Sequence, residues 1–540
     1  MILNRLIRSP WISALLLALV FTFFHVPYLH HALDHFHADE AFNATLVLHT
    51  LSGGDPLPLI LPGAPYQGST ELLWCGLFMK VLGPTVLAYK SAVFVLYLAF
   101  LIIAYQTLVL LTGRRGLSLA VMLLLAIGTP ALHYYAWFSV GGHMTVTVLG
   151  TASIYLALKA RHTPTPLKAV WIAAAAFFCG LAFYTYSLAV VYVLFFVAWG
   201  ILQYGLRDIL RNVFTQRLWQ LGCASFLIGY SPKLLAYFVP ASGYFPPAAP
   251  WCLVGPLGLL GNLSLLFIQI LPLLLGVQAI AVLPAAVGWP DLLALLGILY
   301  TWVVLLAATR LIYQSWPVWR ATVALERRKF TDHELMLLYF FMCLLVYVFT
   351  PNLHDVSSIR FVLPLLSVLP YTLYVGLDFV CSRLNQNKKL VLILGLVLYL
   401  AGLNYQTVAA QGLLNSFSTS REWELSHLTS DLQDCGARYV FVEYAALYTL
   451  EFLSHGHLKG VPFDREKRLL NYSSLCQTML DAPAMQVAYV LKSGSKAQNA
   501  FAKTLEQQKI RHQSHTVGPW MVYQGLSKPL DFFMSYKQIE

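Results

Sequence analysis

The sequence predicts an all-α bundle of membrane-spanning helices with a small α/β domain at its C-terminal end. Of the 540 residues, 58% are hydrophobic and only 11% are charged, and the mean hydropathy is +0.65. Soluble domains carry about 25% charged residues. Apolar runs of about 20 residues, long enough to cross a hydrocarbon core of about 30 Å, recur as far as residue 408. The composition then becomes polar.

About eleven of these runs are expected to cross the membrane. A further apolar stretch, residues 253–285, is interrupted by Pro256, Pro272 and Pro284, so we expect it to lie in the membrane plane or to re-enter. The predicted spans are residues 11–29, 87–112, 116–135, 144–160, 168–186, 188–205, 218–239, 290–312, 334–350, 361–381 and 390–407.

The distribution of Lys and Arg orients the bundle. If the N-terminus is cytoplasmic, the outer loops of the membrane part contain only Lys80, Lys90, Lys233 and Arg360, and the inner loops contain the other basic residues. Cytoplasmic loops are enriched in Lys and Arg, so the pattern predicts an inner N-terminus and an outer C-terminus. The net charge of +11 then reflects topology and does not indicate nucleic-acid binding.

Two regions are expected along the chain. Residues 1–408 form the membrane module, in which residues 30–86 make a long first outer loop with juxtamembrane helices. Residues 409–540 form an α/β domain on the outer face, because strand-like runs alternate there with helical patterns. The strand-like runs are residues 438–444, 486–491 and 520–526.

Two cysteines, Cys435 and Cys476, fall in this outer domain. An oxidising compartment would permit a disulfide between them, and the sequence leaves the pairing open.

A cluster of histidines and carboxylates follows the first span, in "LHHALDHFHADEAFNA" (residues 29–44). Asp39 and Glu40 begin a helical pattern there, where acids also serve as caps that complement the helix dipole. His31, His35 and His37 offer a metal site as an alternative, because a metal ion needs three or four converging ligands. The other interpretation is that these histidines line the membrane interface.

Three segments resemble the GT-C class of integral-membrane glycosyltransferases. They are "ADEAF" (38–42), "PYQGSTELLWCGLFMKVLGPTVLAYK" (65–90) and "SSIRFVLPLLSVLPY" (357–371). They are similar to segments of the protein O-mannosyltransferase and lipid A aminoarabinose-transferase branch, in its bacterial members. Their order agrees with the topology derived from charge.

This resemblance implies transfer of a monosaccharide from a polyprenyl-phosphate carrier, such as undecaprenyl phosphate, to a periplasmic acceptor. The protein would lie in the bacterial inner membrane, with its site and its C-terminal domain facing the periplasm. A phosphate leaving group needs little protonation, so the reaction requires a base for the acceptor hydroxyl and cations for the phosphate. No cofactor is expected, with a divalent metal as the alternative.

Residue roles follow from this chemistry. Asp39 is the expected base, and Glu40 is expected to support it or to position the acceptor. Arg360 is the expected phosphate ligand, because its planar fork suits phosphate geometry. Further candidates for the phosphate are Lys233, Lys80 and Lys90. The expected sugar or acceptor pocket consists of Tyr66, Gln67, His143, His37 and Asp355.

Two other functions fit a membrane protein of this kind. A transporter or flippase for a lipid-linked sugar would carry acids within the membrane and broken helices in paired halves, whereas the acids here cluster in one outer loop. A ligase or polymerase that uses a polyprenyl-diphosphate glycan would need a large late outer loop, and the loop at residues 351–360 is short.

Overall fold

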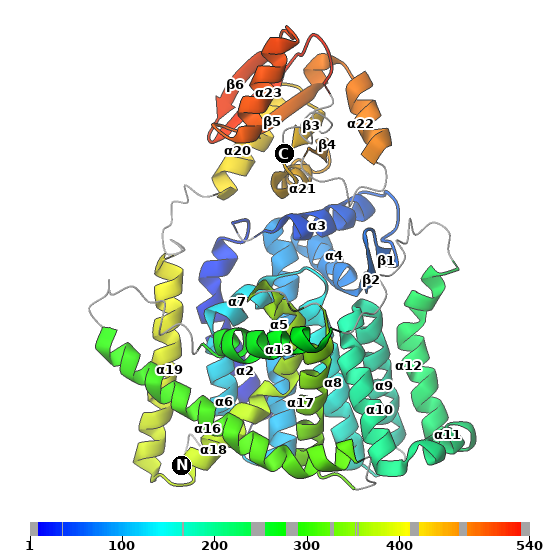
Figure 1. The fold of residues 1–540 in the computed structure, drawn as a ribbon, viewed down its shortest axis with the longest axis vertical. Coiled ribbons are helices and arrows are strands. Elements are labelled where there is room, and N and C mark those ends of the chain that lie inside the picture. The colour runs from blue at the N-terminus through cyan, green and yellow to red at the C-terminus, as the bar shows by residue number, and fades with distance from the viewer. Residues whose placement is uncertain are drawn as a thin grey trace.

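The protein has two layers, a bundle of long helices and a sheet-bearing C-terminal domain at one end of the bundle (Figure 1). The helix α3 (Ala38–Leu51) of the first outer loop lies between them. The structure, a computed structural model, describes residues 9–34, 36–164, 167–238, 254–276, 290–324, 329–351, 353, 356–410, 421–463 and 472–530.

Eight helices in the described ranges are long and apolar enough to cross a membrane, or nine if one bent pair counts as a single span. The chain is therefore a multi-pass membrane protein. The bent pair, Ser358–Ser367 with Leu369–Cys381, turns by 63° where residues 361–381 were predicted to span. The eight are α2 (Pro10–His30), α5 (Val86–Thr112), α9 (Leu167–Thr185), η1 with α10 (Ser187–Tyr204), α13 to α14 (Pro256–Leu274), α16 (Pro290–Val323), α17 (Asp332–Phe349) and α19 (Gln386–Ala410).

Three of the predicted spans correspond to helices that are too short or not apolar enough to count among these eight. They are α6 (Arg115–Ile127), which a turn at Gly128 separates from α7 (Pro130–Trp137), α8 (His143–Arg161) and α12 (Arg217–Ala236). α8 is nonetheless buried along most of its length against α5 and α9.

The stretch at residues 253–285, predicted to lie in the membrane plane or to re-enter, is helical in its described part. Its described part, Pro256–Leu274, is long and apolar enough to span, yet Figure 1 shows α13 (Pro256–Ser264) running across the long helices. Residues 253 and 277–285 of the predicted stretch lie outside the described residues.

Close helix packing inside the bundle depends on small residues. α9 and α12 are in extensive contact. A Cβ atom on Gly180 would lie 2.1 Å from the carbonyl oxygen of Phe226, and one on Gly229 would lie 2.3 Å from that of Phe177. Glycine at both positions lets the two backbones approach, as small residues do between membrane helices.

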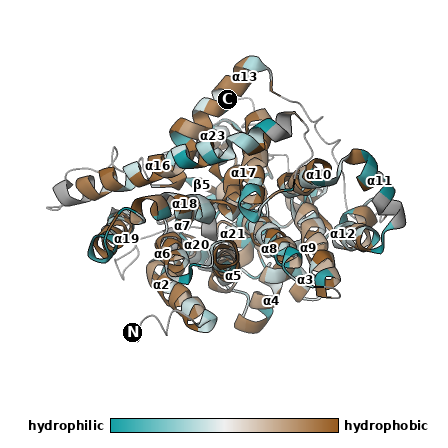
Figure 2. Ribbon diagram, turned by 90° about the horizontal axis from the view of Figure 1, so that it is seen from below, coloured by the Kyte–Doolittle hydropathy of each residue, from teal (hydrophilic) through white to brown (hydrophobic). Residues whose placement is uncertain are grey.

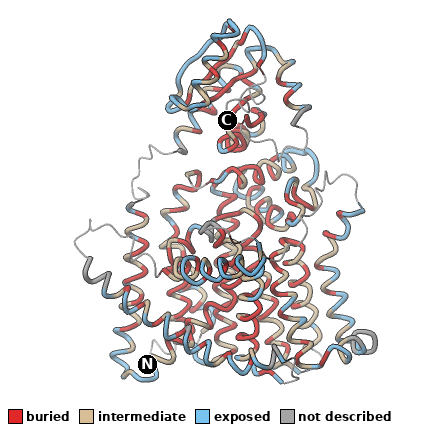
Figure 3. Tube along the Cα trace, viewed as in Figure 1, coloured by how far each residue is buried: buried red, intermediate tan, exposed pale blue. Residues whose placement is uncertain are grey.

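Hydrophobic residues cover the helices of the bundle on their outer as well as their inner faces (Figure 2). Trp11, Phe23 and Trp302 are more than half exposed, and such all-round hydrophobicity is typical of helices in lipid. Burial is densest along the bundle axis and continues up into α3 and into α21 (Tyr444–Leu453), the helix above it (Figure 3).

Residues 30–86, the predicted first outer loop, contribute two helices and a short hairpin. After α3, strands β1 (Ile60–Leu61) and β2 (Ala64–Gly68) pair antiparallel, and α4 (Thr70–Leu82) follows. Gln67 also forms an isolated bridge with Tyr186, which ties the hairpin to the end of α9.

The C-terminal domain contains a five-stranded sheet of order β4-β3-β5-β7-β6. β4, β3 and β5 are parallel, and β5, β7 and β6 are antiparallel. The three predicted strands are confirmed as β3, β5 and β7, whereas β4 and β6 were missed. The elements are α20 (Arg421–Asp434), β3 (Tyr439–Val442), α21 (Tyr444–Leu453), β4 (Lys459–Pro462), α22 (Tyr472–Asp481), β5 (Val487–Lys492), α23 (Lys496–Gln507), β6 (Gln513–Val517) and β7 (Trp520–Gln524).

The permitted disulfide between Cys435 and Cys476 is not formed. The Cys435 thiol donates to the carbonyl oxygen of Leu432 and lies at the edge of the large hydrophobic cluster that extends from the bundle into α21. Cys476 is buried in a separate cluster on the sheet.

Candidate active site

The acidic pair lies at the start of α3, which begins with a capping box. His37 is the N-cap, and its Nδ1 accepts a hydrogen bond from the backbone N–H of Asp39 at 3.2 Å. The Glu40 carboxylate accepts one from the backbone N–H of His37 at 3.0 Å. The same Nδ1 of His37 lies 3.8 Å from the Asp39 carboxylate. The predicted pocket residue His37 thus has a capping role, and Asp39 is not the N-cap.

The two neighbouring acids have different environments. Glu40 is fully buried, and the Lys90 ammonium donates to its two oxygens at 2.6 and 2.7 Å. The backbone N–H of Ser139 adds a third donor at 2.8 Å. The ammonium of Lys90, a predicted phosphate ligand, thus binds this carboxylate, and Lys90 does not line the pocket described below.

A second buried carboxylate, Glu71 at the start of α4, was missed by the sequence reasoning. It accepts hydrogen bonds from the hydroxyls of Ser139 and Thr145, both at 2.7 Å. Burial raises the pKa of the Glu71 carboxyl, and these hydrogen bonds oppose the shift. The Ser139 hydroxyl oxygen in turn accepts a hydrogen bond from the Tyr89 hydroxyl, 2.9 Å away. The sequence signal was the single acid, Glu71, in the segment "GSTELL", at the start of a mostly apolar helix.

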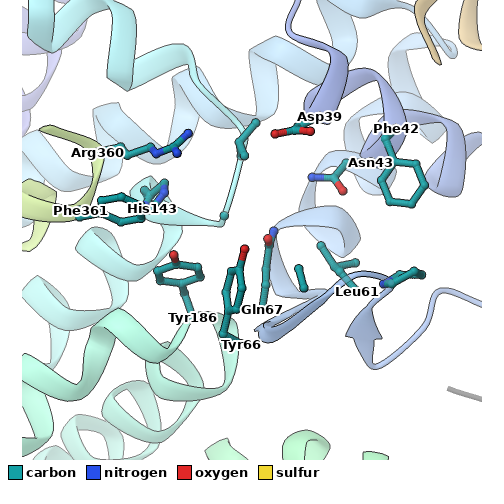
Figure 4. Close-up of a pocket in the computed structure, with 14 residues that line it drawn as sticks. Asp39, Phe42, Asn43, Leu61, Tyr66, Gln67, His143, Tyr186, Arg360 and Phe361 are labelled. Atoms are coloured by element: carbon teal, nitrogen blue, oxygen red, sulfur yellow. The ribbon is translucent and has the colours of Figure 1, made fainter. Parts of the chain in front are cut away.

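A pocket opens beside the first turn of α3. Asp39 projects into it from one side and Arg360, from the 3₁₀ helix η4 (Val356–Ser367), from the opposite side (Figure 4). It is lined by Asp39, Phe42, Asn43, Leu61, Pro62, Ala64, Tyr66, Gln67, Val140, Gly141, His143, Tyr186, Arg360 and Phe361.

Three buried polar atoms in the pocket have no hydrogen-bond partner within the described part of the chain. Nε of Arg360, Nδ1 of His143 and Nε2 of Gln67 are buried and make no hydrogen bond among the described residues. Buried donors and acceptors are normally paired, so these three atoms are available to a polar ligand. The pocket thus brings together five predicted residues, these three with Asp39 and Tyr66.

Aromatic rings in the pocket lining pack against one another and against His143. The ring of Tyr186 lies edge-on to Tyr66, with centroids 5.3 Å apart, and to His143 at 4.9 Å. Phe361 packs against the other side of His143 at 5.6 Å. These contacts fix the orientation of the imidazole, whereas the Tyr66 side chain stays nearly half exposed.

Lys233, on α12, contacts the β1–β2 hairpin next to the pocket. Its ammonium donates to the carbonyl oxygen of Pro65, next to Tyr66 in β2. The side chain is buried and is absent from the pocket lining, so its contact with the hairpin is structural.

Of the remaining predicted residues, Lys80 and His31 do not line the pocket. Lys80 is exposed on α4. Asp355 and His35 lie outside the described residues. His31 is buried, with Nδ1 3.3 Å from Asp34. Within the described ranges, no three His, Cys, Asp or Glu side chains gather closely enough to hold a metal ion.

The C-terminal domain reaches the site through α21. The hydroxyl of Tyr444 donates a hydrogen bond of 2.6 Å to Oδ1 of Asp39. The contact joins residues 405 positions apart, and no local sequence pattern could have predicted it.

The architecture of this chain is that of the GT-C fold class of membrane glycosyltransferases. It is similar to ArnT from Cupriavidus metallidurans bound to undecaprenyl phosphate, with a TM-score of 0.60 at 13% identity over 94% of this chain and 97% of that one. It is also similar to the oligosaccharyltransferase AglB from Archaeoglobus fulgidus, in complex with an inhibitory peptide and a dolichol-phosphate. That TM-score is 0.51 at 11% identity, over 97% and 77% of the two chains.

No protein-family model and no curated protein matches the sequence. At these identities the likeness concerns the fold, and it confirms the resemblance inferred from the motifs at that level.

Proposed function

We propose that the protein is a glycosyltransferase that moves a monosaccharide from a polyprenyl-phosphate carrier to an acceptor at the outer face of the membrane. The observation that carries the proposal is the pocket with Asp39 on one side and Arg360 on the other, next to Gln67 and His143. Each of these last two has a buried polar atom with no hydrogen-bond partner among the described residues. The two solved structures of the same fold that contain undecaprenyl phosphate or a dolichol-phosphate support a carrier of this class.

The proposed reaction needs one base and one anion site. Asp39 accepts the proton of the acceptor hydroxyl while its oxygen attacks the anomeric carbon of the sugar. The bond from that carbon to the phosphate oxygen breaks, and polyprenyl phosphate leaves as an anion. Arg360 holds the phosphate by charge-assisted hydrogen bonds, which strengthen as charge develops on the leaving oxygen.

The other predicted residues take supporting roles in this scheme. Glu40 and Lys90 form the buried ion pair that fixes the first turn of α3. Glu40 thereby positions Asp39 without contacting substrate. Lys233 holds the hairpin that presents Tyr66 and Gln67. His143 and Gln67 offer buried hydrogen-bonding atoms to the hydroxyls of the sugar. Neutral donors and acceptors of this kind suit a carbohydrate better than a charged group would.

The cellular placement follows from the same scheme. In a bacterium, the protein would lie in the inner membrane, with the pocket and the C-terminal domain in the periplasm. The basic residues at the opposite end support this orientation. Labelling of single cysteines introduced at Lys80 and at Arg383 with an impermeant reagent tests it: only the first should react in intact cells whose outer membrane has been made permeable.

The activity test uses the purified full chain in nanodiscs with a panel of radiolabelled undecaprenyl-phosphate monosaccharides, with and without EDTA. Release of free undecaprenyl phosphate, by transfer or by slow hydrolysis, would support the glycosyltransferase and name the sugar. Loss of release in EDTA and its return with a divalent ion would revise the proposal towards a metal-dependent enzyme. Binding of the carriers with no release, even after membrane extract is added as a source of acceptors, would favour the transporter.

A further inference from the structure

Aromatic residues recur at helical spacing on the face of α21 that contacts α3. Tyr444, Tyr448 and Phe452 are four residues apart, so they lie on one side of α21. The ring of Tyr448 packs against Phe42, with centroids 4.9 Å apart, and Phe452 packs against Phe36 at 5.6 Å.

Polar contacts continue the same interface. The hydroxyl of Thr45 donates to the carbonyl oxygen of Tyr448 at 3.4 Å, and Tyr444 donates to Asp39 at 2.6 Å. On α3, Asp39, Phe42 and Thr45 are three residues apart and form the matching face. The two helices therefore meet along a continuous seam, with Asp39 at one end.

The start of α21 is itself anchored to the sheet. Glu443, the residue before the helix, lies 3.3 Å from the ammonium of Lys492 in β5. Tyr444 is buried. Its hydroxyl position is thus determined from two sides, by the sheet behind it and by α3 in front.

We propose that Tyr444 is a positioning residue for Asp39 and that the C-terminal domain, through it, completes the transfer site. This proposal rests on the proposed function. The hydroxyl fixes one oxygen of the carboxylate, which sets the plane in which Asp39 meets the acceptor hydroxyl. Since proton transfer requires a base held within hydrogen-bond reach in the correct orientation, loss of this contact slows the chemical step without weakening the hold on the carrier.

The test compares Tyr444→Phe with the wild type on the carrier that the panel identifies, with full-length protein in nanodiscs. The substitution removes one hydroxyl and keeps the ring. A hydrogen bond to a charged group accounts for a change of about 10- to 100-fold, so kcat is expected to fall by that factor. The KM for the carrier should stay within about twofold, because Tyr444 is not among the residues that line the pocket.

Tyr489→Phe is the matched control. The hydroxyl of Tyr489 is also buried in the C-terminal domain and donates to the carbonyl oxygen of Leu530 at 2.8 Å. Its loss perturbs the same domain without touching Asp39, so kcat should stay near the wild-type value. An equal fall in kcat for both variants would mean general loosening and would overturn the proposal.

A double-mutant cycle separates this proposal from the proposed function. In an Asp39→Asn background, Tyr444→Phe is expected to cause no further loss of residual hydrolysis. Active wild type, inactive Asp39→Asn and fully active Tyr444→Phe would leave the glycosyltransferase intact and refute the positioning role. A wild type that binds no carrier would refute the proposed function, and the positioning role with it.

Discussion

The ammonium of Lys90 lies 2.6 Å from one carboxylate oxygen of Glu40 and 2.7 Å from the other, where neither side chain reaches solvent. This pair joins α3 to α5 across the base of the site. Removal of one partner of a buried ion pair leaves an uncompensated charge, which costs more than the pair itself contributes.

Lys90→Met should therefore lower the free energy of unfolding by about 3–5 kcal/mol, measured by thermal unfolding in detergent micelles. Lys80→Met, at an exposed position on α4, is the control and should change stability by less than about 0.5 kcal/mol. A Lys90→Met protein of normal stability that fails to bind undecaprenyl phosphate would restore the phosphate role that the sequence predicted.

Arg360→Ala should weaken binding of undecaprenyl phosphate by about 10- to 100-fold, because charge-assisted hydrogen bonds contribute about 1.5–3 kcal/mol. Arg360→Lys should recover part of this loss, since an ammonium keeps the charge but not the planar fork. Titration of the carrier phosphate into protein in nanodiscs measures both.

Arg383→Ala controls for the loss of an arginine that stacks on a phenylalanine. Arg383 lies over the ring of Phe379 at 3.6 Å, as Arg360 lies over Phe361 at 5.0 Å. Equal affinity of the wild type and Arg360→Ala for the carrier phosphate would remove Arg360 from the anion site.

Glu451, on α21, gives the stability of the C-terminal domain a pH dependence. Burial raises its pKa from 4.5 to about 7, and Lys459 opposes the shift. Between these values the unfolded chain loses the proton and the folded chain keeps it. The free energy of unfolding is thus highest below pH 4.5 and falls as the pH rises to about 7, by about 1–3 kcal/mol.

Thermal unfolding of the full chain from pH 5 to pH 8 measures this effect as a difference between variants. Glu451→Gln should lose most of the fall, whereas Glu506→Gln, at an exposed position on α23, should retain it. Identical pH profiles of the wild type and Glu451→Gln would contradict the assignment.

The sequence was informative where chemistry is local. Apolar length indicated the spans, and the rarity of arginine in outer loops indicated Arg360. The broken geometry at 358–381 was not predictable, because a 3₁₀ segment and a helix share the same apolar composition. α8 was predicted to span on length, although its threonines and glycine make it less apolar than its neighbours.

The roles of the two acids could not be separated from the sequence. Successive residues on a helix point about 100° apart, so Asp39 and Glu40 had to face different surroundings. Which of them faced the pocket depended on Lys90, which is 50 positions away. Ser139 and Glu71 complete that buried network from two further segments. Such long-range pairing leaves no periodic signal in the chain.

The proposed function depends above all on Asp39 as the base of a transfer reaction from a polyprenyl-phosphate sugar. The most direct measurement is the rate of undecaprenyl phosphate release by Asp39→Asn, together with its affinity for the carrier. Asp55→Asn is the matched control, because Asp55 belongs to the same outer loop, is 97% exposed and is absent from the pocket lining.

Asp39→Asn should lose at least about 100-fold in rate, as expected for loss of a general base, and should still bind the carrier within about threefold of the wild type. Asp55→Asn should release undecaprenyl phosphate at the wild-type rate. An Asp39→Asn protein that transfers sugar as fast as Asp55→Asn would contradict the account.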